Sequence, residues 1–170
     1  MDKNHFVSFT YDTGIRNSLL SWWSQLDRKR GDRAALRRCR SPVEVAFQPS
    51  FYQLMHALES HGNPVNSTRM ALIAGVLSHV RVNNPSLRFA QRMAHGKTGS
   101  ANAAVSGLRF RRYLRIEDPD ELYLSTIRII RLLSGECNIP DLATALYWWQ
   151  NPETKKRLAS DYYENAPLEQ

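Results

Sequence analysis

Cysteine is scarce in this 170-residue chain, and no long hydrophobic run occurs in it. Cys39 and Cys137 are too few for a disulfide framework or a four-ligand zinc site, so we interpret both as buried, reduced thiols. The apolar run at 71–77 is much shorter than the roughly 20 residues that cross a membrane. The first residues lack the charged start and apolar segment of a signal peptide. These absences lead us to expect a cytoplasmic, prokaryotic protein that binds no membrane.

Acidic residues are missing from the middle of the chain. Residues 60–116 contain nine Lys and Arg residues and no Asp or Glu. Residues 1–59 carry a net charge of +3, this middle stretch +9 and residues 117–170 −5, which gives the formal net charge of +7. Most soluble proteins mix charges of both signs over their surface. The uneven distribution therefore predicts a polyanionic partner, and a solvated basic face that only keeps the protein in solution is the alternative.

Helical spacing of apolar residues recurs along the chain, and no segment alternates apolar and polar residues over a strand's length. We expect an all-α fold, a compact bundle of helices in a single domain over residues 1–170, with residues 1–13 as an N-terminal extension. The expected helices cover residues 15–27, 33–39, 66–82, 86–93, 103–116, 120–134, 140–149 and 152–163, and Asp32 is the expected N-cap of the second. One further helix starts at Pro49, or is capped by Ser50, and stops near Gly62. We expect a connector between Pro42 and Pro49 and a flexible loop over His95–Asn102.

The helix expected over 103–116 has a cationic side and an apolar side. At about 100° per residue, the apolar side consists of Phe110, Tyr113 and Leu114, and the cationic side of Arg109, Arg111, Arg112 and Arg115. Packing of the apolar side on the core turns the four guanidinium groups outward together. Their mutual repulsion raises the free energy unless an anion compensates it. The planar guanidinium group is suited to gripping phosphate oxygens in pairs.

Two other groups of arginines follow helical spacing. Arg33, Arg37 and Arg40 are separated by four and three residues, so by this spacing they share one helical face. Arg128 and Arg131 lie on the helix over 120–134, where ion pairs with Glu117, Asp120 or Glu121 are an equally good interpretation. The sequence contains no zinc finger, aromatic RNA-binding strand or recognition helix. Binding is therefore expected to be directed at the nucleic-acid backbone and to weaken with salt.

Two motifs resemble catalytic ones but lack the required context. Gly96-Lys97-Thr98 looks like the end of a P-loop, but position 91 is Gln91 rather than glycine, and no strand precedes it. Asp12-Thr13-Gly14 resembles the triplet of an aspartic protease, whose chemistry needs two facing carboxylates on a β-rich frame. We interpret it as the start of a helix.

No metal site is expected either. The five histidines never occur at the i, i+4 spacing of helical metal ligands. The acids at 117–121 cluster at a helix start, where carboxylates interact favourably with the helix dipole. We therefore expect no cofactor and no enzymatic activity. A Mg²⁺-dependent nuclease that uses Glu117, Asp118 and Glu121 is the catalytic alternative.

Several short motifs follow one another along nearly all 170 residues. They are Leu-x-x-Trp-Trp-x-x-Leu at 19–26, Gly-Asp-Arg-Ala-Ala-Leu-Arg-Arg-Cys at 31–39, Pro-Ser-Phe-Tyr-Gln-Leu at 49–54, Leu-Arg-Phe-Arg-Arg-Tyr-Leu at 108–114, Ile-Pro-Asp-Leu at 139–142, Leu-Tyr-Trp-Trp at 146–149 and Tyr-Tyr at 162–163. In this order and spacing, the chain resembles the CasB family, the small subunit of the type I-E CRISPR surveillance complex Cascade.

The resemblance implies an all-α subunit without enzymatic activity. It implies two copies beside the backbone subunits that hold the guide RNA, with a basic surface that stabilises the target and displaced DNA strands of the R-loop in antiviral defence. The expected partners are other Cascade subunits, guide RNA, both DNA strands and a second copy of the chain. Nucleic-acid binding is assigned to Arg109, Arg111, Arg112, Arg115, Arg33, Arg37, Arg38 and Lys97. A free-standing, sequence-specific DNA-binding regulator is the alternative from another class.

Overall fold

The computed structural model describes residues 6–62, 64–96 and 100–167. Within these residues the chain forms ten helices and one pair of two-residue strands. In chain order they are α1 (Thr13–Gln25), α2 (Arg30–Arg38), α3 (Pro42–Val45), α4 (Pro49–Glu59), α5 (Ser67–Leu77), β1 (Val82–Asn83), α6 (Phe89–Ala94), α7 (Gly107–Leu114), α8 (Pro119–Leu132), β2 (Glu136–Cys137), α9 (Ile139–Tyr147) and α10 (Pro152–Tyr163). The expected all-α fold is confirmed. No helix in the described part is long and apolar enough to cross a bilayer.

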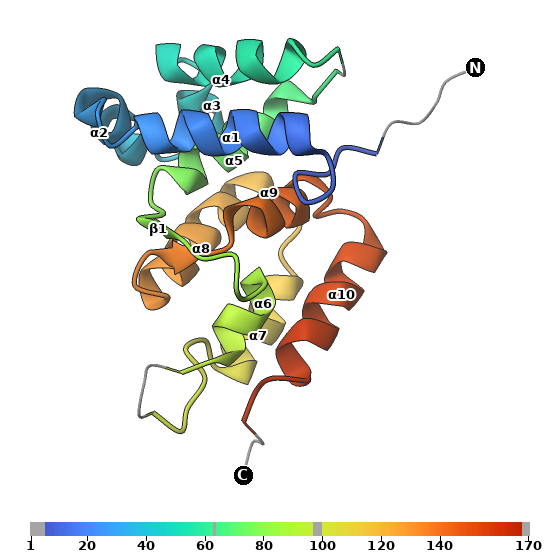
Figure 1. The fold of residues 1–170 in the computed structure, drawn as a ribbon. Helices are drawn as coiled ribbons and strands as arrows, with labels where there is room; N and C mark the ends of the chain where they lie inside the picture. The colour runs from blue at the N-terminus through green and yellow to red at the C-terminus, as the bar shows by residue number, and fades with distance from the viewer. Residues whose placement is uncertain (1–5, 63, 97–99, 168–170) are drawn as a thin grey trace.

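The helices form two groups at opposite ends of the molecule (Figure 1). At one end α1 packs on α4, and both α3 and α4 pack on α5. At the other end α10 packs on α6, with α7 next to them. Helices α8 and α9 both contact α5 and connect the two ends. The most buried helix, α5, therefore belongs to one end and contacts both of the helices that lead to the other.

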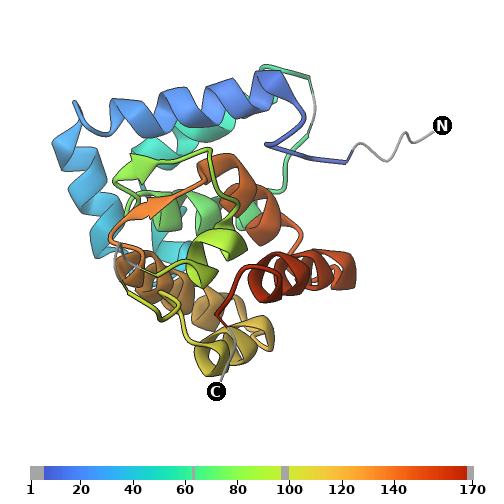
Figure 2. The same ribbon diagram turned by 60° about the horizontal axis from the view of Figure 1, so that its bottom comes forward.

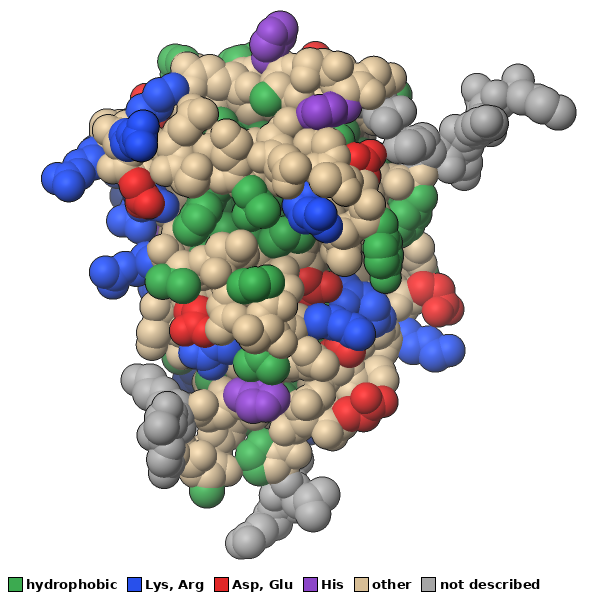
Figure 3. Space-filling model, viewed as in Figure 1, with side chains coloured by type: hydrophobic (Ala, Val, Ile, Leu, Met, Phe, Trp, Pro, Cys, Tyr) green, Lys and Arg blue, Asp and Glu red, His purple; other side chains and the backbone are tan. Residues whose placement is uncertain are grey.

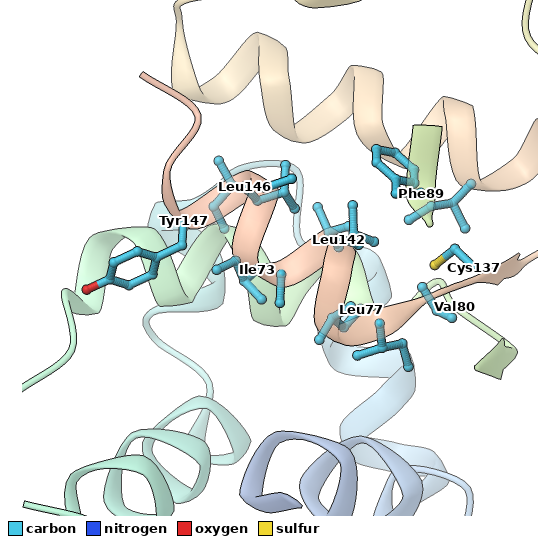
Figure 4. Close-up of a cluster of buried hydrophobic side chains, with 14 of the residues drawn as sticks. Ile73, Leu77, Val80, Phe89, Cys137, Leu142, Leu146 and Tyr147 are labelled. Atoms are coloured by element: carbon cyan, nitrogen blue, oxygen red, sulfur yellow. The ribbon is translucent and has the colours of Figure 1, made fainter. Parts of the chain in front are cut away.

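Helix α5 is buried around its whole circumference between Met70 and Leu77. A helix that is apolar on all sides requires neighbours on all sides, and α3, α4, α8 and α9 provide them. Figure 4 shows Ile73 and Leu77 of α5 beside Leu142 of α9. A helix was expected over 66–82, and the structure forms it over the shorter range Ser67–Leu77.

Short polar side chains begin several of the predicted helices. Oδ1 of Asp12 accepts hydrogen bonds from the backbone N–H groups of Gly14 (3.0 Å) and Ile15 (3.3 Å) at the start of α1. Oδ2 of Asp118 accepts one from the N–H of Glu121 (2.9 Å) at the start of α8. These carboxylates satisfy N–H groups that have no partner within the helix. The triplet at 12–14 is therefore a helix start, as predicted.

Some helix boundaries were wrong. Helix α2 begins at Arg30, so Asp32 lies in its first turn and is not the N-cap. Helix α7 begins only at Gly107, where Ser106 caps it, and the N–H of Val105 donates instead to the carbonyl of Met93 at 3.0 Å. Helix α4 starts with a proline at its first position, so the interpretation that Ser50 caps it was also wrong.

Two short elements were not predicted. Helix α3 occupies part of the expected connector between α2 and α4. Strands β1 and β2 pair in parallel, with Val82 opposite Glu136 and Asn83 opposite Cys137. Neither element is long enough to show a periodic pattern in the sequence.

The described part of the expected N-terminal extension lies against the domain. Val7 and Phe9 are buried. Nε1 of Trp148 donates to the carbonyl of Val7 (2.6 Å), and the N–H of Phe9 donates to Oγ1 of Thr144 (3.0 Å). Residues 7–9 therefore contribute to the core, and the expectation of an extension was wrong for them. Residues 1–5 lie outside the described residues.

The closest backbone approach on α5 gives a stability prediction. A Cβ atom at Gly75 would lie 2.6 Å from Cε2 of Tyr123 and 2.7 Å from Cγ2 of Val45. Gly75→Ala should therefore lower the free energy of unfolding by about 1–3 kcal/mol, although alanine favours helix formation. The midpoint of urea denaturation measures the change.

Gly31→Ala is the matched control, because a Cβ atom at that helical glycine meets nothing within 4 Å. It should leave stability unchanged or raise it by up to about 1 kcal/mol. Equal denaturation midpoints for the two variants would contradict the packing of α5 described above.

Candidate nucleic-acid interface

Aromatic contacts fix the rotation of α7 about its own axis. The ring of Phe110 stacks on Tyr162 of α10, with 4.0 Å between centroids and an interplanar angle of 9°. The hydroxyl of Tyr113 forms a 2.8 Å hydrogen bond with Oγ1 of Thr126 on α8. With these rings buried, the opposite side of α7 faces outward. The helical-wheel prediction is confirmed in that Arg109, Arg111, Arg112 and Arg115 are all exposed.

A groove of about 470 Å³ runs between α7 and α8. Arg109 and Arg112 line it from α7, and Arg128 and Arg131 line it from α8. Among residues 6–62, 64–96 and 100–167, no carboxylate forms an ion pair with any of these four arginines. We refer to Arg109, Arg112, Arg128 and Arg131 as the groove arginines.

The groove combines these cations with apolar side chains. Tyr113 and Ile129 lie at its base and are almost fully buried. Glu121 also lines the groove but forms no ion pair with Arg128 or Arg131 within the described part of the chain. The interpretation that local carboxylates pair with these two arginines was therefore wrong.

The four arginines predicted on α7 divide between two positions. Arg109 and Arg112 line the groove, whereas Arg111 and Arg115 are exposed without lining it. The sequence placed all four on one side, and the structure separates them because only Arg109 and Arg112 line the groove shared with α8. Arg128 and Arg131 replace the outer pair in the groove.

The arginines of α2 are held by the end of α5. Arg33 forms an ion pair with Asp27 and donates to the carbonyl of Val80 at 3.3 Å. Nε of Arg37 donates to the carbonyl of Ser78 at 2.8 Å. Ser78 is the C-cap residue of α5 and Val80 lies just after it, so these bonds attach α2 to the end of α5 and to the segment that follows. The Arg33 side chain is only 14% exposed, which limits it to a supporting charge.

Of the two remaining predicted residues, Arg38 and Lys97, the structure describes only Arg38. Arg38 is exposed at the end of α2. Lys97 lies outside the described residues, as do residues 98 and 99, so its assignment stays a prediction; the described parts of the expected loop, 95–96 and 100–102, form no helix or strand.

His79 connects the α2 arginines to the groove. Burial, followed by the charges of Arg131 and Arg37, lowers the pKa of His79 from its usual 6.5 to about 4. Burial and the charges of Arg33 and Arg81 similarly lower the pKa of Arg37. Charges that act on one another in this way lie close together in space. The α2 cluster and the end of α8 therefore belong to one positive region.

Both ribbon views place α8 between α2 and α7 (Figure 1, Figure 2). Figure 3 shows Lys and Arg side chains along the edge of the molecule that α2 forms. We use the term basic band for the arginines that run from α2 across α8 to α7. They are Arg33, Arg37, Arg81, Arg131, Arg128, Arg112 and Arg109.

Sequence reasoning missed Arg81 and His79 as parts of this region. Arg81 lies in the acid-free stretch, which was the available signal, but it follows α5 without any helical partner at i+3 or i+4. His79 was considered only as a metal ligand. In the described residues its Nε2 atom and Nε of Arg33 are buried without a hydrogen-bond partner.

The acids at the start of α8 act as helix-starting residues. Asp118 caps α8, and no group of three His, Cys, Asp or Glu residues in the described part could hold a metal ion. Cys39 and Cys137 are both buried, as interpreted from the sequence, and burial raises the pKa of each thiol.

Comparison with known proteins adds a family. Residues 32–163 match the family model of CRISPR-associated protein Cse2. Among solved structures, the chain is similar in fold to a chain in a crystal structure of E. coli Cascade bound to a PAM-containing dsDNA target. The two share 21% sequence identity with a TM-score of 0.67, over 85% of this chain and 91% of that one. A comparison with curated proteins gave no match.

The position of His79 gives a pH prediction. Its ring should titrate at about pH 4 in the folded chain, and Arg131→Ala should raise this pKa because it removes a neighbouring positive charge. The ring pKa can be measured by NMR. A ring that titrates near 6.5 in the unaltered chain would contradict the burial and the neighbouring charges.

The same shift predicts how stability depends on pH. The folded pKa of His79 lies below the unfolded value of about 6.5, so protonation favours the unfolded chain. The contribution is fully present above pH 6.5 and is lost as the pH falls towards about 4. His79→Leu should therefore reduce the loss of stability between pH 7 and pH 4.5, measured by urea denaturation. His56→Leu, at an exposed histidine of α4, is the control.

Proposed function

Because the chain belongs to the Cse2 family of CRISPR-associated proteins, known also as CasB, we propose that it is the non-catalytic small subunit of a type I-E Cascade complex. In this role it binds the nucleic-acid backbone without reading sequence and stabilises the target and displaced strands of the R-loop in antiviral defence. Its partners are the other Cascade subunits, the guide RNA, both DNA strands and a second copy of the chain. The complex acts in the cytoplasm.

The observation that supports this role best is the set of groove arginines. Four guanidinium groups from two helices line one groove, and no described carboxylate pairs with them. Like charges held this close destabilise the folded chain unless an anion binds between them. Phosphodiesters are such anions, and arginine binds them in pairs of hydrogen bonds.

The remaining arginines extend the surface for backbone contacts. We assign direct contacts to Arg111 and Arg115 on the outer side of α7 and to Arg37 and Arg38 on α2, all of them exposed. Arg33, whose side chain is mostly buried, contributes only its positive charge to this surface. Contacts of this kind position a strand but carry no sequence information, so guide pairing supplies the specificity.

A modest binding energy suffices for this function. R-loop formation exchanges a DNA duplex for an RNA–DNA duplex of about the same stability. Contacts to the separated strands therefore decide whether the open state persists. Each phosphate that a cation neutralises releases condensed counterions, which makes binding to single strands depend on salt with a slope of about −0.7 per phosphate.

Paired arginine substitutions test the assignment. Arg109→Ala with Arg112→Ala, and separately Arg128→Ala with Arg131→Ala, should each weaken binding of a single-stranded oligonucleotide. Each pair should also flatten the plot of log K against log salt by roughly 1.4 units, since two phosphate contacts are lost. Fluorescence anisotropy at several salt concentrations measures both quantities, and circular dichroism checks that the variants fold.

Lys155→Ala with Lys156→Ala removes the same charge from α10 and is the matched control. It should change the salt slope much less than either groove pair. An unchanged affinity and slope in both groove pairs would refute the proposal. A larger effect of Arg111→Ala with Arg115→Ala would indicate that the strand binds along the outer side of α7 and not in the groove.

The proposal also predicts equal affinity for two unrelated duplexes of the same length at the same salt concentration, because the contacts are to phosphates. A preference of tenfold or more for one of them, measured by competition, would favour the sequence-specific regulator instead.

A further inference from the structure

Phosphate binding does not account for the apolar part of the groove between α7 and α8. The buried side chains of Tyr113 and Ile129 form the floor of the groove, and Leu132, which is 36% exposed, lies at its edge. Phosphates bind to cations and N–H groups, whereas apolar side chains make no favourable contact with them. The volume of about 470 Å³ is in the range of roughly 300–1,000 Å³ typical of small-ligand pockets.

We propose that this groove holds an unpaired base of a single-stranded nucleic acid, while the groove arginines bind the phosphates on either side of that base. The inference rests on the proposed function and deepens it, because it distinguishes unpaired strands from duplexes. The apolar floor of the groove, formed by Tyr113 and Ile129, contacts the nucleobase. Guanidinium planes from α7 and α8 stack on its faces, as arginine does with nucleic-acid bases.

The distribution of charge along α8 orients the strand in the groove. Glu121, Ser125 and Arg128 are spaced by four and three residues and line the same groove. Glu121 lies in the first turn of α8 and repels phosphate from that end of the groove, so the backbone lies towards Arg128 and Arg131 near the other end of the helix. The base edge then points to Glu121 and Ser125, whose oxygens accept hydrogen bonds from N–H groups of bases, among them N3–H of thymine.

A duplex cannot use the groove in this way. Its bases are stacked and paired, and turning one out costs a few kcal/mol. The displaced strand of an opened duplex offers unpaired bases without that cost. The groove therefore favours the opened state of DNA over the closed one, beyond what backbone charge alone provides.

Two oligonucleotides with equal charge test the inference on the full chain. One is a strand of thymidines, and the other has the same length and phosphates but abasic sites throughout. Stacking of a base on a protein side chain is worth about 1–3 kcal/mol, so the abasic strand should bind about fivefold more weakly or worse. Both strands should show the same salt slope, because their phosphate contacts are the same.

A variant that fills the groove tests whether the nucleobase binds there. Ser125→Leu places an apolar side chain in the groove without changing charge and should abolish the preference for thymidine while keeping the salt slope. Ser160→Leu, on the exposed side of α10, is the matched control and should keep the preference.

Equal affinity of the two strands, with a steep salt slope, would overturn the base site and leave backbone binding intact. A preference that survives in the Ser125→Leu variant would also overturn it, because the base would then bind elsewhere. Failure of the proposed function gives a different result, in which the paired arginine variants bind both strands like the unaltered chain.

Discussion

The packing of two aromatic rings from α7 is the interaction on which the basic surface depends. Phe110 stacks on Tyr162, and Tyr113 is held by Thr126, so α7 has only one rotation in which both rings are buried. That rotation turns its arginines outward. Burial of large aromatic side chains stabilises a fold by several kcal/mol, which exceeds the repulsion between solvent-screened guanidinium groups. The hydrophobic core thus maintains a concentration of positive charge that the surface alone would disperse.

Not every cation of the acid-free stretch belongs to this surface, and the acids of the C-terminal third explain why. Arg88 pairs with Asp161 at 3.0 Å, and Arg157 bridges Asp161 and Asp141 at 3.3 and 2.9 Å. These carboxylates are nearly buried, so the pairs hold α6, α9 and α10 together. The excess of acid after residue 116 is therefore partly consumed inside the molecule, while the cations of α7 remain outside it. Charge counts along a sequence cannot separate the two uses.

The sequence predicted features that depend on residues within one helix, but it did not predict contacts between helices. The two sides of α7 and the capping role of Asp12 follow from spacing and residue type within a single helix. The proximity of Arg37 and Arg131 to His79 depends on how α2 and α8 pack around the end of α5, and no periodic pattern records that. The pairing of β1 with β2 is missed for the same reason, since each strand has only two residues. The candidate site was thus half predictable. The α7 wall was assigned from its pattern, whereas Arg128 and Arg131 of α8 were recognised as a spaced pair but could not be assigned to the site, because their neighbours depend on how α7 and α8 lie together.

Burial of both native thiols has a practical consequence for spectroscopy. Cys137 is 1% exposed and Cys39 7%, and each has a raised pKa, so little thiolate is present at neutral pH to react with a maleimide. A single cysteine introduced on the surface is therefore the site that a fluorescent dye modifies, without removal of the natural residues. Fluorophores placed this way at the open end of the α7 and α8 groove and on α10 would follow strand capture and release by energy transfer in real time.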